Sequence, residues 1–381
     1  MKAVLITNNF PPLKDGVGDH SWHLADGLCQ VGYDVEVLSV ANPKIKKESS
    51  KPAFKLSPII RNFGISGILN LGKIIAGRKA DVVLFQYVPY AYSQWGVPFP
   101  LIFLYGYLRF KGIKVLTIVH EPFIRFGAGF KYVGVALAQR LIALFIFGLS
   151  SALVTSIGLY KKMLTPFNHN IFQIPIGSNI TPVTLTNDEK VRLRLQYALP
   201  DTYLIATFGN RDPTLLLDAL RILVQNQHSV KVLFLGNNNK LDAKRKKGDY
   251  ADLLPHLFTT GFLEPEPLFK LLLISDIFVL PENVDTKGRG GASLKSGSLA
   301  AAYSAGLPII SNRGDMTDAC LKHKENIYFT DNDATDLANS IRNILDDHSL
   351  RNSLRVNALA FYKNYLSWDK ALLSYEEIIK F

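Results

Sequence analysis

This sequence has little cysteine, and it also lacks long apolar runs and clusters of metal ligands. The 381 residues include two cysteines, Cys29 and Cys320, too few for a disulfide framework, and we expect both to be reduced in a cytoplasmic compartment. No continuous apolar run reaches the roughly 20 residues that span a bilayer. The apolar run that begins at Ala3 is too short for a signal peptide. No His/Cys cluster with metal-ligand spacing occurs, so we expect no metal and no other resident cofactor.

Acidic residues are outnumbered by basic ones. The sequence has 43 Lys and Arg against 32 Asp and Glu, a formal net charge of +11, which favours anionic partners such as nucleotides and phospholipid surfaces. The basic residues do not interleave with aromatic ones in a recognisable module, so we expect no nucleic acid partner. Apolar residues make up 48% of the chain, enough for two domains that each have a core.

Short apolar runs alternate with helical patterns along the whole chain. Runs that predict buried strands include Ala3–Thr7, Lys114–Val119, Tyr203–Phe208 and Val230–Leu235, and Gly- or Pro-rich turns separate them from the helical patterns. This alternation is typical of α/β folds with parallel sheets. Ligands of such folds bind at the carboxyl ends of the strands, so polar residues directly after a strand are candidate site residues.

One stretch joins a predicted strand, a loop and a helix. The run Asp276–Pro281 predicts the strand, Glu282–Gly291 is a Gly-rich basic loop, and the small residues of Ser293–Ser304 predict a tightly packed helix. A loop before a helix directs backbone N–H groups and the positive end of the helix dipole at one place. We expect a phosphate or diphosphate there, with Arg289 and Lys295 adding charge. A solvated basic loop beside a buried helix is the equally weighted alternative.

A second Gly-rich loop follows the first predicted strand. Gly16, Gly18 and Asp19 lie there, before a helical pattern that ends at Gly32. The pair of glycines suggests a dinucleotide site, but Ser21 stands where that motif needs its third glycine, so NAD is a weak alternative. Asp19 is either the N-cap of the helix or a side chain that holds a substrate.

Two further side chains follow predicted strands. His120 comes directly after Lys114–Val119 and before Glu121-Pro122, where we expect it to face a cleft, although a lone His is more often a satisfied polar residue. Arg211 follows Tyr203–Phe208, and a guanidinium suits diphosphate oxygens. Both are therefore candidate site residues.

The order of these features resembles that of family 4 glycosyltransferases. The resemblance is carried by Asp276–Pro281, the Gly-rich loop after it, Ala305–Ile310, and Phe10-Pro11-Pro12 ahead of Gly16. It implies a retaining enzyme that uses a nucleotide sugar and has the α/β GT-B fold, with two facing Rossmann-like, doubly wound domains and an interdomain cleft. The domains that it implies are 1–178 on the acceptor side, 190–362 for the nucleotide sugar, and a C-terminal helix, 363–381, that crosses back to the first domain.

The resemblance also implies roles for single residues. The catalytic candidates are His120, Asp19 and Asp285; the diphosphate candidates are Gly16, Gly18, Arg211, Arg289 and Lys295; the nucleobase candidates are Gly261 and Phe262. One departure concerns the two Glu of the family, spaced eight positions apart. Counted back from Gly306, their places hold Ser293 and Ala301. Counted forward from the strand, the first place falls on Asp285, which is why we expect that carboxylate to act there.

Basic and apolar residues in the first half predict membrane contact. The stretch Pro43–Lys55 contains five lysines, and Ile59–Ile75 has apolar residues at helical spacing. Both suit an anionic membrane surface, where each basic residue adds about 1 kcal/mol; a solvated surface loop is the alternative. The resemblance implies a glycan or lipid-linked acceptor. We therefore expect a peripheral protein on the inner face of the cytoplasmic membrane, active in cell-envelope polysaccharide synthesis.

Two other functions stay open from the sequence. In an inverting transferase, a His near the end of the first strand deprotonates the acceptor, and His20 lies near that place. The missing Glu pair also fits a GT-B-like protein that only binds a nucleotide or lipid-linked ligand.

Overall fold

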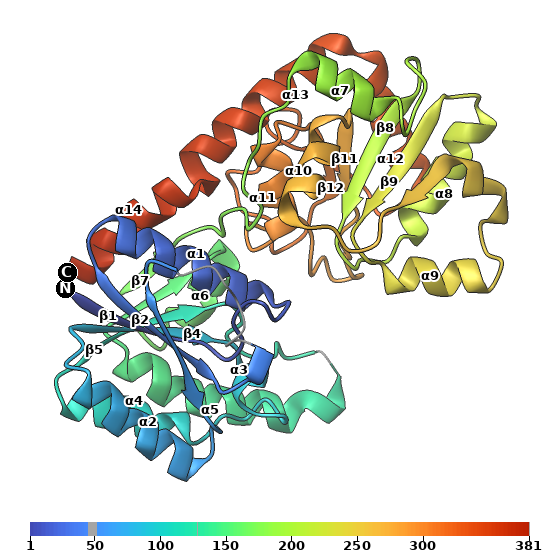
Figure 1. The fold of residues 1–381 in the computed structure, drawn as a ribbon. Helices are drawn as coiled ribbons and strands as arrows, with labels where there is room; N and C mark the ends of the chain where they lie inside the picture. The colour runs from blue at the N-terminus through green and yellow to red at the C-terminus, as the bar shows by residue number, and fades with distance from the viewer. Residues whose placement is uncertain (45–51, 128, 381) are drawn as a thin grey trace. The chain divides into compact units, whose positions relative to one another are not determined.

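The computed structural model describes residues 1–44, 52–127 and 129–380, and the chain divides into two compact units (Figure 1). Unit 1 comprises Met1–Ile176 and Trp368–Phe381, and unit 2 comprises Gly177–Ser367. Three of the lysines on which membrane contact was predicted, Lys46, Lys47 and Lys51, lie outside the described residues.

A parallel sheet with the order β3-β2-β1-β4-β5-β6-β7 forms the centre of unit 1. Its strands are β1 (Lys2–Ile6), β2 (Asp34–Val40), β3 (Lys55–Ile60), β4 (Val82–Tyr87), β5 (Lys114–Val119), β6 (Ala152–Thr155) and β7 (Ile171–Gln173). All residues of β4 are buried, as expected of a parallel strand with helices on both faces. The strand order reverses between β1 and β4, so the switch point where α/β sheets bind ligands lies at their carboxyl ends.

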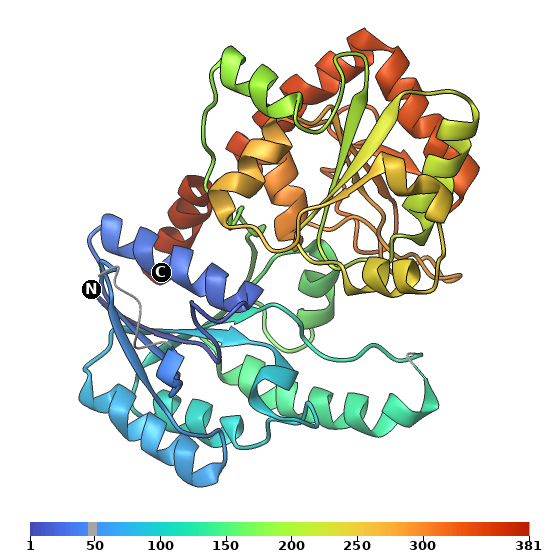
Figure 2. The same cartoon turned by 45° about the vertical axis from the view of Figure 1, so that its right-hand side comes forward.

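The helices of unit 1 form a layer on each face of this sheet (Figure 2). They are α1 (Gly16–Gln30), α2 (Ile65–Gly77), α3 (Pro89–Tyr92), α4 (Leu101–Phe110), α5 (Val133–Leu149) after the short turn η2 (Phe130–Tyr132), α6 (Gly158–Leu164) and α14 (Trp368–Lys380). One core joins the sheet to α1 and α14, and the other joins it to α2, α4 and α5. The last helix packs on α1, because Gly27 leaves room for the side chain of Leu372.

Unit 2 repeats the design with the order β10-β9-β8-β11-β12-β13. Its strands are β8 (Tyr203–Phe208), β9 (Val230–Leu235), β10 (Leu257–Thr259), β11 (Ile277–Leu280), β12 (Ile309–Asn312) and β13 (Tyr328–Thr330), and all of their pairings are parallel. Here the order reverses between β8 and β11. The topology therefore predicts a ligand site at the residues that follow these two strands.

Most helices of unit 2 begin at a side chain that caps them. The helices of this unit are α7 (Asn187–Arg194), α8 (Thr214–Gln225), α9 (Asn239–Lys246), α10 (Pro265–Leu273), α11 (Gly297–Ser304), α12 (Ala334–Asp346) and α13 (His348–Phe361), with the turns η3 (Ala251–His256) and η4 (Tyr362–Leu366). Of these, α8 and α10 have no such cap. Ser296 caps α11 by accepting a hydrogen bond from Leu299 N, and Asp333 caps α12 by accepting from Thr335 N and Asp336 N. Such caps satisfy N–H groups that have no partner inside the helix.

Two predicted helices were wrong at their starts. The stretch Ile59–Ile75 was predicted as one helix, but Ile59 and Ile60 end the edge strand β3, and α2 starts at Ile65. The helix predicted from Ser293 starts at Gly297, because Ser296 supplies the cap. In the first case Ile59 and Ile60 continue the helical spacing of the apolar residues that follow, although they end an edge strand, which tolerates Pro58.

One helix of the described residues is long and apolar enough to cross a membrane by length and composition, Phe130–Leu149. It consists of η2 and α5. Its inner face belongs to the core of unit 1, and 33% of its most apolar stretch is buried.

Candidate functional site

The switch point of unit 2 holds an ion pair. Arg211 follows β8 and Glu282 follows β11, and the two side chains meet across the carboxyl ends of these strands. Arg211 Nε and Nη2 donate to Glu282 Oε1 at 2.9 and 2.7 Å. Both side chains are half-buried, so water screens this pair less than a fully exposed one.

The other donors of the Arg211 guanidinium also have partners. Nη2 donates to Ser296 Oγ at 3.1 Å, and Nη1 donates to the Phe208 carbonyl at 3.2 Å. Asn238 holds the backbone of the same loop, since its Nδ2 donates to the Arg211 carbonyl at 3.0 Å. The guanidinium is therefore fixed beside the first turn of α11, where the helix dipole is positive.

Glu282 was not among the predicted site residues. Its backbone N–H donates to Asn312 Oδ1 at 3.2 Å, and Asn312 is buried at the end of β12. The available signal was an acidic residue that directly follows a buried strand and a proline. What the sequence does not reveal is that the carboxylate meets Arg211, 71 residues away in the chain.

The places of the missing Glu pair lie on either side of the start of α11. Ser293 precedes the helix and is buried, and Ala301 lies within it and is fully buried. An acidic side chain at 301 would therefore enter a packed core. Lys295 is half-buried and lies two residues before α11, close to the predicted anion position.

Asp285 and Arg289 bind each other within the Gly-rich loop. Arg289 Nε donates to Asp285 Oδ2 at 2.6 Å, and the backbone N–H groups of Lys287 and Arg289 donate to Asp285 Oδ1. The backbone N–H of Arg289 is the largest of the causes that lower the pKa of Asp285. The structure thus gives Asp285 a role in closing the loop, and its predicted catalytic role stays a prediction.

The predicted nucleobase turn follows β10. Gly261 has a φ of +65°, which favours glycine, and it forms a bridge with Gly236 after β9. Thr260 connects the two turns, because its Oγ1 accepts from Gly236 N at 3.0 Å and donates to the Gly261 carbonyl at 2.9 Å. Phe262 is half-exposed. These residues lie at the carboxyl edge of the same sheet as Arg211.

In unit 1 the two predicted glycines have different surroundings. A Cβ on Gly18 would lie 3.1 Å from the Asn9 carbonyl oxygen, whereas a Cβ on Gly16 would meet nothing within 4 Å. Gly18 is thus needed for close packing of α1 against the turn after β1. Packing within the described structure does not require Gly16, which leaves its backbone open to a ligand.

Asp15, not Asp19, is the N-cap of α1. Asp15 Oδ1 accepts from Val17 N at 2.8 Å, and its Oδ2 accepts from Asn9 Nδ2 at 2.7 Å. Asp19 lies one turn further along, half-buried. Burial, and then the negative charge of Asp15, raise the pKa of Asp19 to about 6. A carboxyl group with such a pKa changes its charge close to neutral pH.

Gln86, on β4, connects His120 to His20. His120 Nε2 donates to Gln86 Oε1 at 2.6 Å, and Gln86 Nε2 donates to His20 Nδ1 at 3.4 Å. An amide oxygen only accepts and an amide nitrogen only donates. His120 therefore carries a proton on Nε2, and the neutral His20 carries its proton on the other nitrogen. Gln86 was not predicted, because a buried polar residue inside a strand gives no local signal of its partners.

His20 is a supporting ring in this arrangement. It is 4% exposed, and it packs against His120 and Trp368 with centroid distances of 5.1 and 5.2 Å. Burial, followed by the charges of His120 and His23, holds the pKa of His20 well below its ordinary value. With Nδ1 directed at Gln86, the ring is poorly placed to accept a proton from an acceptor hydroxyl.

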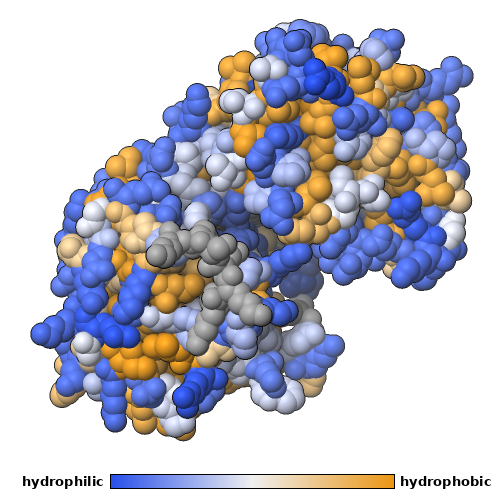
Figure 3. Space-filling view, viewed as in Figure 1, coloured by the Kyte–Doolittle hydropathy of each residue, from blue (hydrophilic) through white to orange (hydrophobic). Residues whose placement is uncertain are grey.

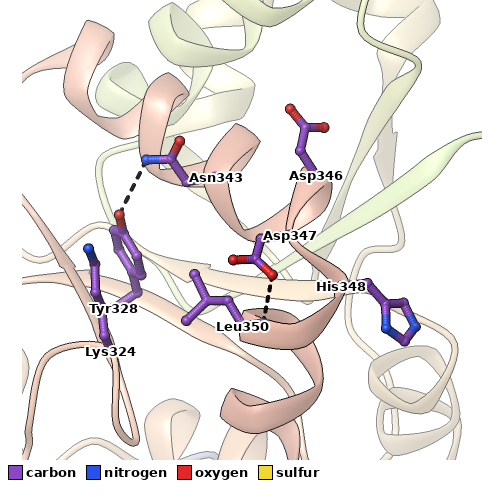
Figure 4. Close-up of a pocket in the computed structure, with 7 residues that line it drawn as sticks. All are labelled: Lys324, Tyr328, Asn343, Asp346, Asp347, His348 and Leu350. Atoms are coloured by element: carbon purple, nitrogen blue, oxygen red, sulfur yellow. Dashed lines mark hydrogen bonds between the residues drawn. The ribbon is translucent and has the colours of Figure 1, made fainter.

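Unit 2 contains an Asp-x-Asp triplet, Asp331-Asn332-Asp333, a pattern that can hold a metal ion. In this structure Asp333 caps α12. Among the described residues no group of His, Cys, Asp and Glu could hold a metal ion. A cavity of about 550 Å³ lies beside Tyr328, Asn343 and Asp347 (Figure 4). Tyr328 is the first residue of β13, so this cavity is at the amino edge of the sheet, away from Arg211.

Comparison with known protein families gives a match over the part of the chain that contains Arg211 and Glu282. Residues 203–361 match the family described as "Glycosyl transferases group 1". The matched range lies within unit 2 and includes Arg211, Glu282 and α11. The match supports a glycosyltransferase. A search of curated protein sequences finds no match.

The structure resembles solved glycosyltransferases over its whole length. A glycosyltransferase from Rickettsia africae has a TM-score of 0.72 at 17% identity, covering 100% of this chain and 97% of that one. HepE from Anabaena, solved with UDP, has a TM-score of 0.75 at 13% identity, covering 100% of both chains. Sucrose-phosphate synthase from Thermosynechococcus elongatus has a TM-score of 0.73 at 16% identity, covering 100% and 98%. These likenesses show the GT-B fold, and the predicted fold class of two Rossmann-like domains is confirmed.

Asp19 should make stability depend on pH. Its pKa is raised from 3.8 to about 6 in the folded state, so the folded state holds this proton more tightly, and stability falls as the pH rises between about 4 and 6. Asp19→Asn should remove that loss. At pH values above 6, the variant should therefore melt at a higher temperature than the parent, because its free energy of unfolding is larger by about 1 kcal/mol after allowance for solvent screening. Below pH 4 the two proteins should melt at nearly the same temperature.

Thermal unfolding across this pH range measures the effect. Asp26→Asn, on the same helix, controls for removal of one negative charge from α1. A gain for Asp19→Asn that is equally large at every pH would contradict the assignment.

Gln86→Glu should place a carboxylate between the two rings. A negative charge next to an imidazole favours its protonated form, so the pKa of His20 should rise. Titration of the ring C–H signals by NMR measures it, with His228 and His256 of unit 2 as internal references. If the His20 signals keep their midpoint while the variant stays folded, the bridge through Gln86 is refuted.

Proposed function

We propose that the protein transfers a sugar from a nucleoside-diphosphate sugar to a hydroxyl group of an acceptor, without a metal ion and with retention of the anomeric configuration. The observation that carries the proposal is the position of Arg211, at the switch point of the domain that matches the transferase family. HepE, which shares the fold, was solved with UDP. The sequence resemblance adds the retaining outcome and a glycan or lipid-linked acceptor of the cell envelope, in the cytoplasm or on the inner face of its membrane.

The donor diphosphate binds at the carboxyl edge of the sheet in unit 2. Arg211 and the first turn of α11 supply fixed positive charge there, and Lys295 adds to it. Fixed donors of this kind stabilise the negative charge that develops on the leaving nucleoside diphosphate. Gly261 and Phe262, on the same edge, are the contacts for the nucleobase. Arg289 is the weaker candidate for the diphosphate, because its Nε is already paired with Asp285.

Glu282 competes with the diphosphate for Arg211. The guanidinium directs Nε and Nη2 at one carboxylate oxygen, which is the pair of donors that a phosphate would use. A diphosphate that binds Arg211 therefore replaces the carboxylate contact. In the absence of donor, Glu282 keeps the guanidinium oriented.

The acceptor side is assigned to unit 1. His120 is oriented by Gln86 and positions the transferred sugar. Asp19, whose pKa of about 6 makes it basic for a carboxylate, holds the acceptor hydroxyl. Gly16, with open space over its backbone, allows the close approach of a phosphate.

Arg211→Met should weaken binding of the cognate nucleoside diphosphate about tenfold or more, because a charge-assisted contact is lost. Glu282→Gln should strengthen it, because the competing carboxylate is removed while the side-chain size is kept. Calorimetric titration with UDP, GDP and ADP in the presence of EDTA measures both variants.

Arg221→Met is the matched control. Arg221 forms a similar pair with Asp252, at 2.8 Å, but on α8 and not at the carboxyl edge, so its loss should leave binding unchanged. If no nucleoside diphosphate binds, or if Arg211→Met binds like the parent, the donor site is elsewhere and the proposal fails.

The stereochemistry of the product tests the retaining assignment. With the donor identified by titration, NMR of the anomeric proton in the product should show the configuration of the donor. His20→Asn should reduce stability more than it reduces the rate, since the ring is a packing element. An inverted product together with an inactive but folded His20→Asn protein would replace this reading with the inverting mechanism.

A further inference from the structure

The positive charge of this protein is concentrated in one part of unit 1. Residues 61–187 contain twelve Lys and Arg but only two acidic residues, Asp81 and Glu121. Neither acid lies on α2, α4 or α5, the helices that cover one face of the sheet. That layer carries basic residues, among them Lys73 and Arg109, without an acidic one.

The outer face of α5 is apolar along its whole length. Its exposed residues are Val133, Gly134, Leu137, Leu141, Leu144, Phe145 and Gly148, and Leu141 is 64% exposed. They recur at helical spacing, so they form one stripe. Exposed apolar stripes of this length are unusual on a free surface and mark an interaction site.

Aromatic side chains extend the stripe at its start. Phe130 is 95% exposed and Phe126 is half-exposed. The Arg140 guanidinium holds the segment before α5, because Nη1 donates to the Ile124 carbonyl at 2.9 Å and the group stacks on Phe126 at 3.8 Å. On the neighbouring helix α4, Phe103 is exposed as well. Hydrophobic and hydrophilic residues lie side by side on the face of unit 1 that Figure 3 shows.

We propose that the outer face of α5, with Phe126, Phe130 and Phe103, docks unit 1 on an anionic lipid surface. The apolar stripe enters the headgroup region, and the basic residues around it meet the lipid charges. This surface differs from the predicted one: the outer face of α2 includes the polar Ser66, Asn70 and Lys73, whereas that of α5 is apolar throughout. The docking does not depend on the transfer chemistry.

Two other occupants of this face are less suitable. Spanning the bilayer would surround α5 with lipid, but its inner face packs in the core, and Gln139 there donates to the Gly96 carbonyl and accepts from Ile124 N. A second copy of the chain would bring two strongly basic surfaces together, which costs free energy. An anionic lipid surface complements both the charge and the apolar stripe.

Flotation of the full chain with lipid vesicles tests the proposal. The protein should float with vesicles of phosphatidylcholine and phosphatidylglycerol, much less with phosphatidylcholine alone, and less in high salt because salt screens the charges. The combined variant Leu137→Gln, Leu141→Gln and Phe145→Gln should lower the partition into anionic vesicles at least about tenfold. These side chains are exposed, so the melting temperature should not fall.

The matched control is Leu195→Gln, Leu199→Gln and Val356→Gln, which removes three exposed apolar side chains from unit 2 and should leave flotation unchanged. Equal loss in the control, or equal flotation with neutral vesicles, overturns the proposal. Sedimentation without vesicles supplies the remaining outcome: if the parent is a dimer and the α5 variant a monomer, the face is an interface between copies. Because nucleotide titration reads the donor site separately, failure of docking and failure of the proposed function are distinguishable.

Discussion

The ion pair between Arg211 and Glu282 is the constraint on which the candidate donor site depends. It joins the ends of β8 and β11, and through Ser296 it reaches the cap of α11. A lone guanidinium at this edge would be free to turn toward water, and a lone carboxylate would repel the anion that we expect there. Together they keep the cation in place, and a diphosphate oxygen can accept from the same two donors, Nε and Nη2, that now bind Glu282 Oε1. Orientation before binding is what makes such a group effective in stabilising charge.

In unit 1, the side chains at the switch point are oriented by a neutral amide instead of an ion pair. At its switch point an amide, Gln86, lies between two imidazoles and fixes the proton on each. Beside them, Asp15 and Asp19 bring carboxyl groups, and burial, followed by the charge of Asp15, raises the pKa of Asp19 to about 6. The two sheets thus present different chemistry at corresponding places: fixed positive charge in unit 2, suited to an anionic leaving group, and oriented neutral donors in unit 1, suited to hydroxyl groups. This division is the physical basis for assigning donor and acceptor to different units.

The sequence predicts much of the fold, because buried parallel strands are continuous apolar runs that Gly and Pro punctuate. The strands at Lys114–Val119 and Tyr203–Phe208 have the predicted bounds. The edge strand β3 was missed, because its first residue ends a lysine-rich stretch and Ile59 and Ile60 fit the helical spacing of the residues after them. The short α7 was not predicted, although Thr186 and Glu189 form a capping box that the sequence displays. The predicted site residues stay predictions; Gln86 and Glu282 were not predicted, because their hydrogen bonds join distant parts of the chain.

In water, the apolar face of α5 and the basic residues around it have opposite effects on association. The exposed stripe favours association with any apolar surface, while like charge keeps copies of the chain apart. An anionic lipid surface can cover the apolar stripe and also attract the basic residues. The core is not disturbed, since the inner face of α5 stays packed on the sheet. The positive charge that attracts unit 1 to anionic lipid would also repel a basic protein and attract an acceptor that carries a phosphate. This distribution of charge supports our proposal of a lipid-linked acceptor.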